Sequence, residues 1–65
     1  GIGSRLLEYL LEDLKKEGIK TVVLEVRKSN QKAIYLYKKF NFVEIDVLVK
    51  FYPDGEDALY MIKDL

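Results

Sequence analysis

Thr21-Val22-Val23-Leu24-Glu25-Val26 is the stretch that decides the fold of this 65-residue chain. It is mostly apolar and rich in β-branched residues, which is typical of a strand buried on both faces, as in a parallel sheet. The polar residues 27–30 follow it, and either Ser29 or Asn30 can cap a helix. The next apolar residues recur at helical spacing and predict a helix over residues 31–40: Ala33, Leu36, Tyr37 and Phe40. Asn41 ends this helix, because Asn tolerates the left-handed conformation.

A second helix is predicted before the strand, over residues 4–17. Ser4 is a good N-cap residue, and Gly18 is a suitable C-terminal stop, with Ile19 available for the hydrophobic contact beyond it. The apolar face of this helix is formed by leucines at helical spacing: Leu7, Leu10, Leu11 and Leu14.

Two further strands are predicted after the second helix. Apolar and charged residues alternate over 43–50, although Leu48 interrupts the pattern. Pro53-Asp54-Gly55-Glu56 is typical of a turn, and residues 58–62 form a last strand, so the two strands make a hairpin. If the first two strands are parallel neighbours, the helix between them makes a right-handed crossover.

Composition excludes several classes of protein. A chain of this length buries only about 60% of its unfolded surface and is marginally stable. It has neither cysteine nor histidine, which excludes disulfides, argues against a zinc site and fits a cytoplasmic protein. Lys plus Arg and Asp plus Glu balance at 11 each, so no basic stripe predicts a nucleic-acid partner. The apolar runs are too short to cross a membrane.

Gly1-Ile2-Gly3 precedes the first predicted helix and is typical of a phosphate-binding turn. Glycine lets the backbone approach a ligand closely, and the N-terminus of a helix offers unpaired N–H groups and a partial positive charge. Gly1 and Gly3, with the N–H groups of Ser4 and Arg5, are therefore candidates for holding a pyrophosphate. On pattern alone, a loop that merely precedes a helix is an equally good interpretation.

Glu25 is the one charged residue within the apolar strand, near its carboxyl end. Ligand sites of open α/β sheets lie at that end. A partly buried carboxylate there can act as a general base, directly or through water. From the pattern alone, however, a strand-end Glu paired with Lys or Arg is the better supported interpretation.

Several motifs together resemble the GNAT superfamily of N-acetyltransferases. Gly1-Ile2-Gly3-Ser4 matches the second half of its acetyl-CoA motif, Arg/Gln-x-x-Gly-x-Gly/Ala, whose first half would lie upstream. Residues 30–37, Asn-Gln-Lys-Ala-Ile-Tyr-Leu-Tyr, match its Asn-x-x-Ala-x-x-Leu-Tyr signature. That signature normally ends in Gly-Phe, and here Asn41-Phe42 stands instead, a mild departure because Asn is the best substitute for Gly at positive φ.

Two more segments resemble the amino-terminal protein acetyltransferases within that superfamily. They are Leu24-Glu25-Val26-Arg27 and residues 52–58, Tyr-Pro-Asp-Gly-Glu-Asp-Ala. The subfamily includes the bacterial ribosomal-protein alanine acetyltransferases and the catalytic subunit of the eukaryotic and archaeal type A enzyme. It often has two tyrosines before the turn, and here the first is Phe51.

The resemblance implies an α/β fold in which residues 1–65 form the acetyl-CoA-binding, C-terminal half of a GNAT domain. The order would be helix, strand, helix, strand, strand, with a mixed sheet ending in an antiparallel hairpin. A complete member has upstream strands and helices that supply one wall of the acceptor groove and hold the thioester. The implied donor is acetyl-CoA without a metal, and the implied acceptor is an amine, in the subfamily a peptide or protein N-terminus.

The resemblance also implies roles for particular side chains, each beside a plainer explanation. Glu25 would be the base, and Tyr37 would be the general acid for the CoA thiolate, although helical spacing alone indicates a core tyrosine. Asn30 would contact CoA, or simply cap a helix, or do both. Tyr52 would grip the first peptide unit of the substrate, or merely pack beside the turn. Asp54-Gly55 is better explained by turn chemistry than by catalysis.

Three functional hypotheses follow from these observations. The first is the cofactor-binding half of an N-terminal protein acetyltransferase. The second is a CoA-binding or structural half-domain without turnover, which forms a homodimer through open sheet edges or hairpin exchange. The third, a fragment of a Rossmann protein, is weak, because no strand precedes the glycines and no third glycine follows at the required spacing.

Overall fold

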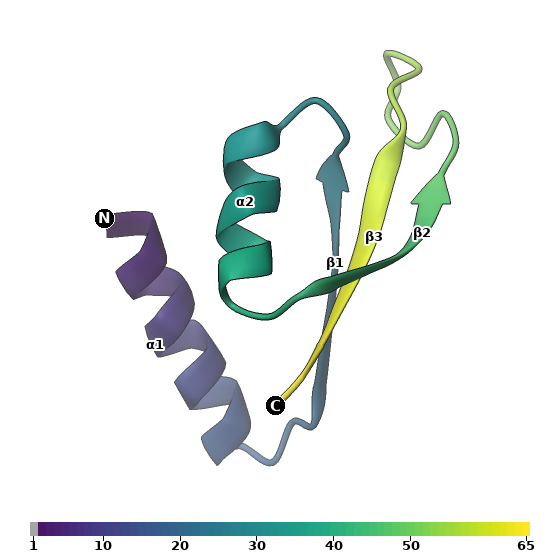
Figure 1. Cartoon of the computed structure of the whole chain (residues 1–65). Helices are drawn as coiled ribbons and strands as arrows, with labels where there is room; N and C mark the ends of the chain where they lie inside the picture. The colour runs from purple at the N-terminus through teal and green to yellow at the C-terminus, as the bar shows by residue number, and fades with distance from the viewer. Residues whose placement is uncertain (1) are drawn as a thin grey trace.

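The structure, a computed structural model, describes residues 3–65 in full and the backbone of Ile2. Its elements follow in the order α1 (Ile2–Lys16), β1 (Thr21–Arg27), α2 (Gln31–Lys39), β2 (Val43–Leu48) and β3 (Ala58–Asp64) (Figure 1). The predicted order of helix, strand, helix, strand, strand is therefore confirmed. The first helix begins earlier than expected, so Ser4 is not its N-cap, and Gly3 lies within the helix and not in a turn before it. Gly1 lies outside the described residues.

Both helices end on the same backbone motif, which positive φ angles make possible. At the end of α1, Gly18 has a φ of 86°, the N–H of Ile19 donates to Leu14 and the N–H of Gly18 donates to Lys15. At the end of α2, Asn41 has a φ of 70° and donates to Lys38, while the N–H of Phe42 donates to the carbonyl of Tyr37. These are paired Schellman bonds, which satisfy the last carbonyls of a helix. The predicted stops at Gly18 and Asn41 are confirmed.

The sheet has the strand order β1-β3-β2, with β3 antiparallel to both neighbours. The predicted terminal hairpin of β2 and β3 is confirmed. The first two strands are not neighbours, because β3 lies between them, so the condition for a crossover between adjacent parallel strands is not met (Figure 1). Both pairings among the described residues are antiparallel, where a mixed sheet was expected. Within this part of the chain, β1 and β2 are the edge strands.

One face of the sheet is covered and the other is open. Val26 of β1 is buried, whereas Thr21, Val23 and Glu25 are exposed, so β1 is not buried on both faces as its composition suggested. Antiparallel sheets commonly have one solvated face, and the β-branched content of β1 alone could not distinguish the two cases. In β2, the register shifts between Glu44 and Asp46, which places Ile45 in a bulge and breaks the expected alternation of faces.

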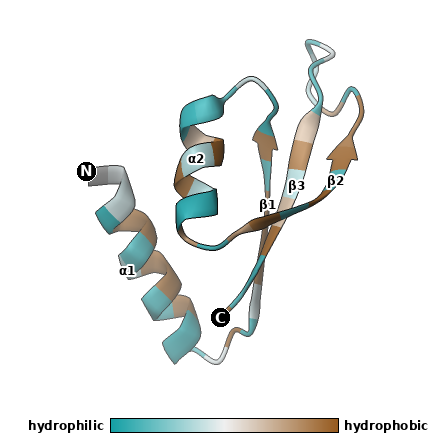
Figure 2. Cartoon of the chain, viewed as in Figure 1, coloured by the Kyte–Doolittle hydropathy of each residue, from teal (hydrophilic) through white to brown (hydrophobic). Residues whose placement is uncertain are grey.

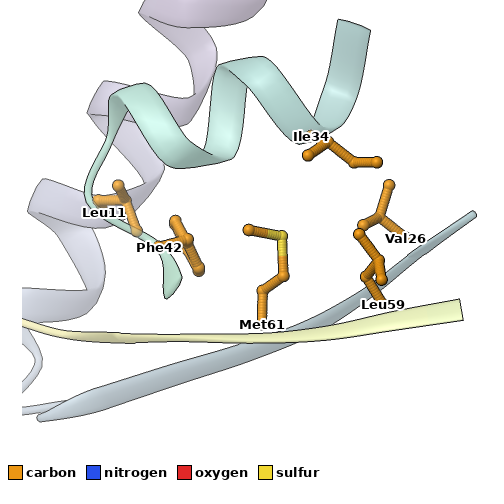
Figure 3. Close-up of a cluster of buried hydrophobic side chains, with 6 residues drawn as sticks. All are labelled: Leu11, Val26, Ile34, Phe42, Leu59 and Met61. Atoms are coloured by element: carbon orange, nitrogen blue, oxygen red, sulfur yellow. The ribbon is translucent and has the colours of Figure 1, made fainter. Parts of the chain in front are cut away.

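The core lies between α2 and the covered face of the sheet, with one leucine contributed by α1 (Figure 3). Met61, in the central strand, is fully buried, and the cluster around it contains five further side chains: Leu11, Val26, Ile34, Phe42 and Leu59. Of the leucines expected on the inner face of α1, Leu7 packs against this cluster, but Leu10 is 53% exposed. The core is small, as expected for a chain of this length.

Apolar side chains also remain on the surface. Hydrophobic residues occur along α1 and along β2 (Figure 2), and Leu6 of α1 is 65% exposed while Val43 and Ile45 of β2 are 56% and 51% exposed. Neither helix, in the part of the chain that the structure describes, is long and apolar enough to cross a membrane.

Candidate functional site

The N-terminal turn of α1 presents backbone donors next to open space. The amides of Gly3 and Ser4 belong to the first turn of α1, which begins at Ile2, and the N–H groups of the first turn of a helix have no acceptor within the helix. A Cβ placed on Gly3 would meet nothing within 4 Å, and the side chain of Arg5 is exposed. A phosphate group can therefore approach the backbone of this turn closely. Of the four residues expected to hold a pyrophosphate, Gly1 lies outside the described residues.

Glu25 lies on the open face of the sheet, near the carboxyl end of β1. Its register partner on β3 is Tyr60, and two residues later Arg27 lies opposite Ala58. The carboxylate is exposed, not partly buried as expected, and among residues 2–65 it takes part in none of the ion pairs. It is therefore accessible to an amine or a water molecule.

Asn30 caps α2, as predicted. Its side-chain oxygen accepts a hydrogen bond from the N–H of Ala33 at 3.2 Å, and its own N–H donates to the carbonyl of Arg27 at 2.9 Å. The cap fixes Asn30 directly after β1, on the same side of the fold as the carboxyl end of that strand. Capping uses one side-chain oxygen lone pair and leaves the amide NH2 of Asn30 free of any role in the cap.

Tyr37 lies in the last turn of α2 and packs against the core cluster. The centroid of its ring is 5.6 Å from that of Phe42, in an edge arrangement with an interplanar angle of 61°. This contact is the hydrophobic partner of the Schellman motif, which joins these same positions. The packing explanation for Tyr37 is thus confirmed, and Tyr37 packs on the covered side of the sheet, whereas Glu25 lies on its open face.

Tyr52 belongs to the connection between β2 and β3 and is held by an arginine from another element. The guanidinium carbon of Arg27 lies 4.1 Å from the centroid of the Tyr52 ring, and Phe51 meets that ring edge-on at 5.1 Å. The same Arg27 donates from Nη1 to Asp54 Oδ2 at 2.6 Å and to Glu56 Oε1 at 2.9 Å. Arg27, Tyr52, Asp54 and Glu56 are called the Arg27 cluster below.

The turn beside Tyr52 is built as its sequence predicts. Gly55 has a φ of 88°, and its N–H donates to the carbonyl of Tyr52. Asp54 accepts the N–H of Glu56 at 3.0 Å, a bond from side chain to backbone two residues on. Asp54 therefore supports the turn, and its other carboxylate oxygen pairs with Arg27.

Hydrogen bonds shift the pKa values of the charged groups in the Arg27 cluster. The N–H of Glu56 and then the guanidinium of Arg27 lower the pKa of Asp54. Hydrogen bonding by Ser29, followed by that from Arg27, lowers the pKa of Glu56. Glu56 and Asp54 in turn raise the pKa of Arg27 above its ordinary value. Each of these shifts favours the charged form, so Arg27, Asp54 and Glu56 are ionised at neutral pH.

Arg27 and Glu56 could not be identified as partners of Tyr52 from the sequence. Arg27 was assigned to a polar loop, but it is the last residue of β1. Its partners lie 27 and 29 positions later, and only the pairing of β1 with β3 brings them together. The sequence did offer one signal: Arg27 at the end of β1 is opposite in charge to Asp54 and Glu56, which lie just before β3. Among the described residues, no three carboxylates form a group suited to a metal ion.

The chain matches known proteins along its whole length. Residues 1–42 match the model of the acetyltransferase (GNAT) family. The "N-alpha-acetyltransferase" of Sulfolobus acidocaldarius is 47% identical, over all of this chain and 39% of the relative. The "[Ribosomal protein bS18]-alanine N-acetyltransferase" of Escherichia coli K12 is also 47% identical, over 94% of this chain and 43% of the relative.

A solved structure shows the same architecture. The crystal structure of the NatC complex bound to Gag peptide and CoA has a chain that superposes with a TM-score of 0.97 at 26% identity, covering all of this chain and 41% of that one. An α/β half-fold of two helices and three strands, matched at this level in sequence and structure, defines the class of protein. The chain belongs to the GNAT family of acetyltransferases, and it spans about two fifths of the length of the curated relatives that it matches.

Proposed function

We propose that residues 1–65 are the acetyl-CoA-binding, C-terminal half of an N-acetyltransferase domain that acts on the α-amine of a protein N-terminus. The observation that carries the proposal is the family match over residues 1–42, which contains Gly3, Glu25, Asn30 and Tyr37. Relatives named for N-α-acetylation and for ribosomal-protein alanine acetylation support the choice of acceptor.

In this proposal, the first turn of α1 binds the pyrophosphate of acetyl-CoA. The amides of Gly3 and Ser4 donate to phosphate oxygens, and the missing side chain of Gly3 leaves the necessary space. Gly1 and Arg5 are assigned to the same phosphate site. Asn30 adds a polar contact from the start of α2. Acetyl-CoA supplies the acetyl group and the thiolate leaving group.

The transfer needs one proton acceptor and one proton donor. Glu25 takes the proton from the attacking amine, directly or through water, as the nitrogen bonds to the carbonyl carbon. When the carbon–sulfur bond breaks, Tyr37 donates its phenolic proton to the departing sulfur. Tyr52 orients the first peptide unit of the acceptor beside Glu25.

The test is acetylation of peptides by a full-length acetyltransferase that carries these 65 residues. We expect transfer to peptide α-amines, and we expect Glu25→Gln to lower turnover about 10²-fold, the usual range for a lost general base. The control is Glu17→Gln, which removes an exposed carboxylate just after α1, at the opposite end of that helix from the proposed phosphate site. Acetylation of lysine side chains but of no α-amine would overturn the proposed acceptor.

A non-catalytic half-domain that self-associates is the second candidate. The exposed apolar residues of β2 and the free edges of β1 and β2 favour it, because such edges pair readily with another chain. Light scattering, which gives the oligomeric state of the 65-residue chain, and titration of the chain with acetyl-CoA together distinguish the candidates. A stable dimer that binds no acetyl-CoA would support the structural role, whereas a monomer that binds acetyl-CoA would exclude it.

A further inference from the structure

The connection between β2 and β3 has little hydrophobic anchorage of its own. Its nine residues, 49–57, are all exposed or half-buried, and none belongs to the core cluster. Tyr52, the proposed peptide contact, lies in the middle of this segment. A loop without buried side chains loses order easily, unless polar contacts hold it.

Arg27 supplies most of the side-chain contacts that hold this loop from outside. It is the last residue of β1, opposite Ala58, the first residue of β3. From there its guanidinium reaches Tyr52 by stacking, and it reaches Asp54 and Glu56 by hydrogen bonds of 2.6 and 2.9 Å. Three residues of one loop are thus fixed by a single planar group.

The same cluster attaches the loop to the start of α2. Glu56 Oε2 accepts the N–H of Ser29 at 2.9 Å, while its other oxygen accepts from Arg27. The carbonyl of Arg27 accepts the N–H of Asn30, and the N–H of Lys28 donates to the carbonyl of Asp57. Tyr52, on the peptide side, and Asn30, on the proposed CoA side, are therefore joined through Arg27 and Glu56.

The cluster is better suited to orientation than to stability. The side chains of Arg27 and Asp54 are 40% and 59% exposed, and exposed ion pairs contribute little to stability because solvent screens them. Only arginine combines a flat stacking surface with several donors in a fixed plane, so lysine cannot reproduce the arrangement.

We propose that Arg27 is a positioning residue that holds Tyr52 and the 49–57 loop in the geometry needed to receive the N-terminal peptide unit of the acceptor. The inference rests on the proposed function, since it assigns Arg27 a role through Tyr52. A loop that is already ordered before the peptide binds loses less entropy on binding. The peptide therefore binds more tightly than it would to a disordered loop.

The test is steady-state kinetics of Arg27→Gln and Arg27→Lys in a full-length acetyltransferase that carries this chain. We expect both variants to raise KM for the peptide about tenfold, with kcat and the KM for acetyl-CoA changed less than about twofold. Lys38→Gln is the matched control, because it removes a cation of the exposed Lys38–Glu44 pair, at 3.0 Å, far from the loop. A thermal melt of each variant confirms that it is folded.

The outcomes separate this inference from the function on which it rests. If the unmodified enzyme acetylates α-amines but Arg27→Gln leaves the peptide KM unchanged, the positioning role is wrong and the proposed function stands. If Arg27→Lys behaves like the unmodified enzyme, charge alone suffices and the planar geometry is irrelevant, which also overturns the inference. If the unmodified enzyme acetylates no α-amine, the proposed function and the role of Arg27 in it both fall.

Discussion

The ring of Tyr37 has a packing role in the core, whereas its hydroxyl has a proposed chemical role. Its ring meets Phe42 edge-on and completes the end of α2, which accounts for a large apolar residue at this position. A phenylalanine would satisfy that demand equally well, so the hydroxyl is not explained by the ring contact. The role of Tyr37 as proton donor to the CoA thiolate remains a prediction.

Tyr37→Phe separates the two demands. We expect the free energy of unfolding to change by less than about 0.5 kcal/mol, because the ring contact is retained. We expect turnover of a full-length enzyme carrying the chain to fall about 10²-fold, with acetyl-CoA affinity nearly intact. Stopped-flow or steady-state kinetics, with a denaturant melt beside them, measure both. Unchanged turnover would reduce Tyr37 to a core residue.

The carboxylates of the Arg27 cluster predict how stability depends on pH. Asp54 and Glu56 have native pKa values below their ordinary values of 3.8 and 4.5. A carboxylate of this kind stabilises the fold above its unfolded pKa, and the contribution disappears as the pH falls through the lower native pKa. Arg27 stays protonated throughout, so it contributes no step of its own in this range.

Urea unfolding of the unmodified chain and of Arg27→Gln between about pH 6 and about pH 2 tests this pH dependence. We expect the unmodified chain to be the more stable at pH 6 and the difference to shrink as the pH falls below the ordinary carboxyl values. A difference that stays constant with pH, or that grows in acid, would contradict a contribution of Arg27 to the lowered pKa values of Asp54 and Glu56.

At the scale of the element, the helix ends show what local sequence determines. Gly18 and Asn41 both have positive φ, at 86° and 70°, and both close Schellman bonds. Asn adopts this conformation at a steric cost that Gly does not have. The two helices thus end in the same motif, but glycine adopts the required positive φ more easily than asparagine does.

Substitutions at these two positions should have opposite effects. We expect Asn41→Gly to stabilise the chain by up to about 1 kcal/mol and Gly18→Ala to destabilise it by about 1 kcal/mol. We expect neither substitution to change the fold. A Cβ at Gly18 meets nothing within 4 Å, so the loss of stability in Gly18→Ala comes only from the strained positive φ. Thermal melts of both variants decide the matter. If Asn41→Gly instead lowers the melting temperature, the side chain of Asn41 must stabilise the native state by more than its positive φ costs.

Elements with strong local signals were predictable from the sequence, and the relations between elements were not. The helix stops, the cap at Asn30 and the turn at Asp54-Gly55 follow from short-range chemistry and are confirmed. The predicted start of α1 is wrong because Gly3, although glycine is a poor helix former, lies inside the first turn of the helix. The bulge at Ile45 could not be inferred, because an extra residue leaves the composition of a strand unchanged.

The candidate site shows the same division. Family motifs gave Glu25, Asn30, Tyr37 and Tyr52, whose placement is now defined but whose roles are predictions. Arg27 required the antiparallel pairing of β1 with β3, a contact between residues far apart in sequence. Local pattern does not encode such contacts.

At the scale of the whole molecule, the chain retains a core but leaves apolar surface open. Met61 is fully buried, yet Leu6 and Tyr9 on α1 and Val23 on β1 are 65%, 64% and 48% exposed. Apolar surface of this kind is typical of an interface with another part of a protein. It is expected if residues 1–65 are one half of a larger domain, with β1 pairing with a further strand.

The most direct test of the account is calorimetric titration of the 65-residue chain with acetyl-CoA, compared with its Gly3→Val variant. We expect saturable one-to-one binding by the unmodified chain and an affinity about tenfold lower for Gly3→Val, whose side chain obstructs the approach of a phosphate to the backbone. A thermal melt should show that the variant is folded, since a Cβ at Gly3 meets nothing within 4 Å. No heat of binding from the folded, unmodified chain would contradict a formed acetyl-CoA site in these residues, and equal affinity in the variant would contradict its location at Gly3.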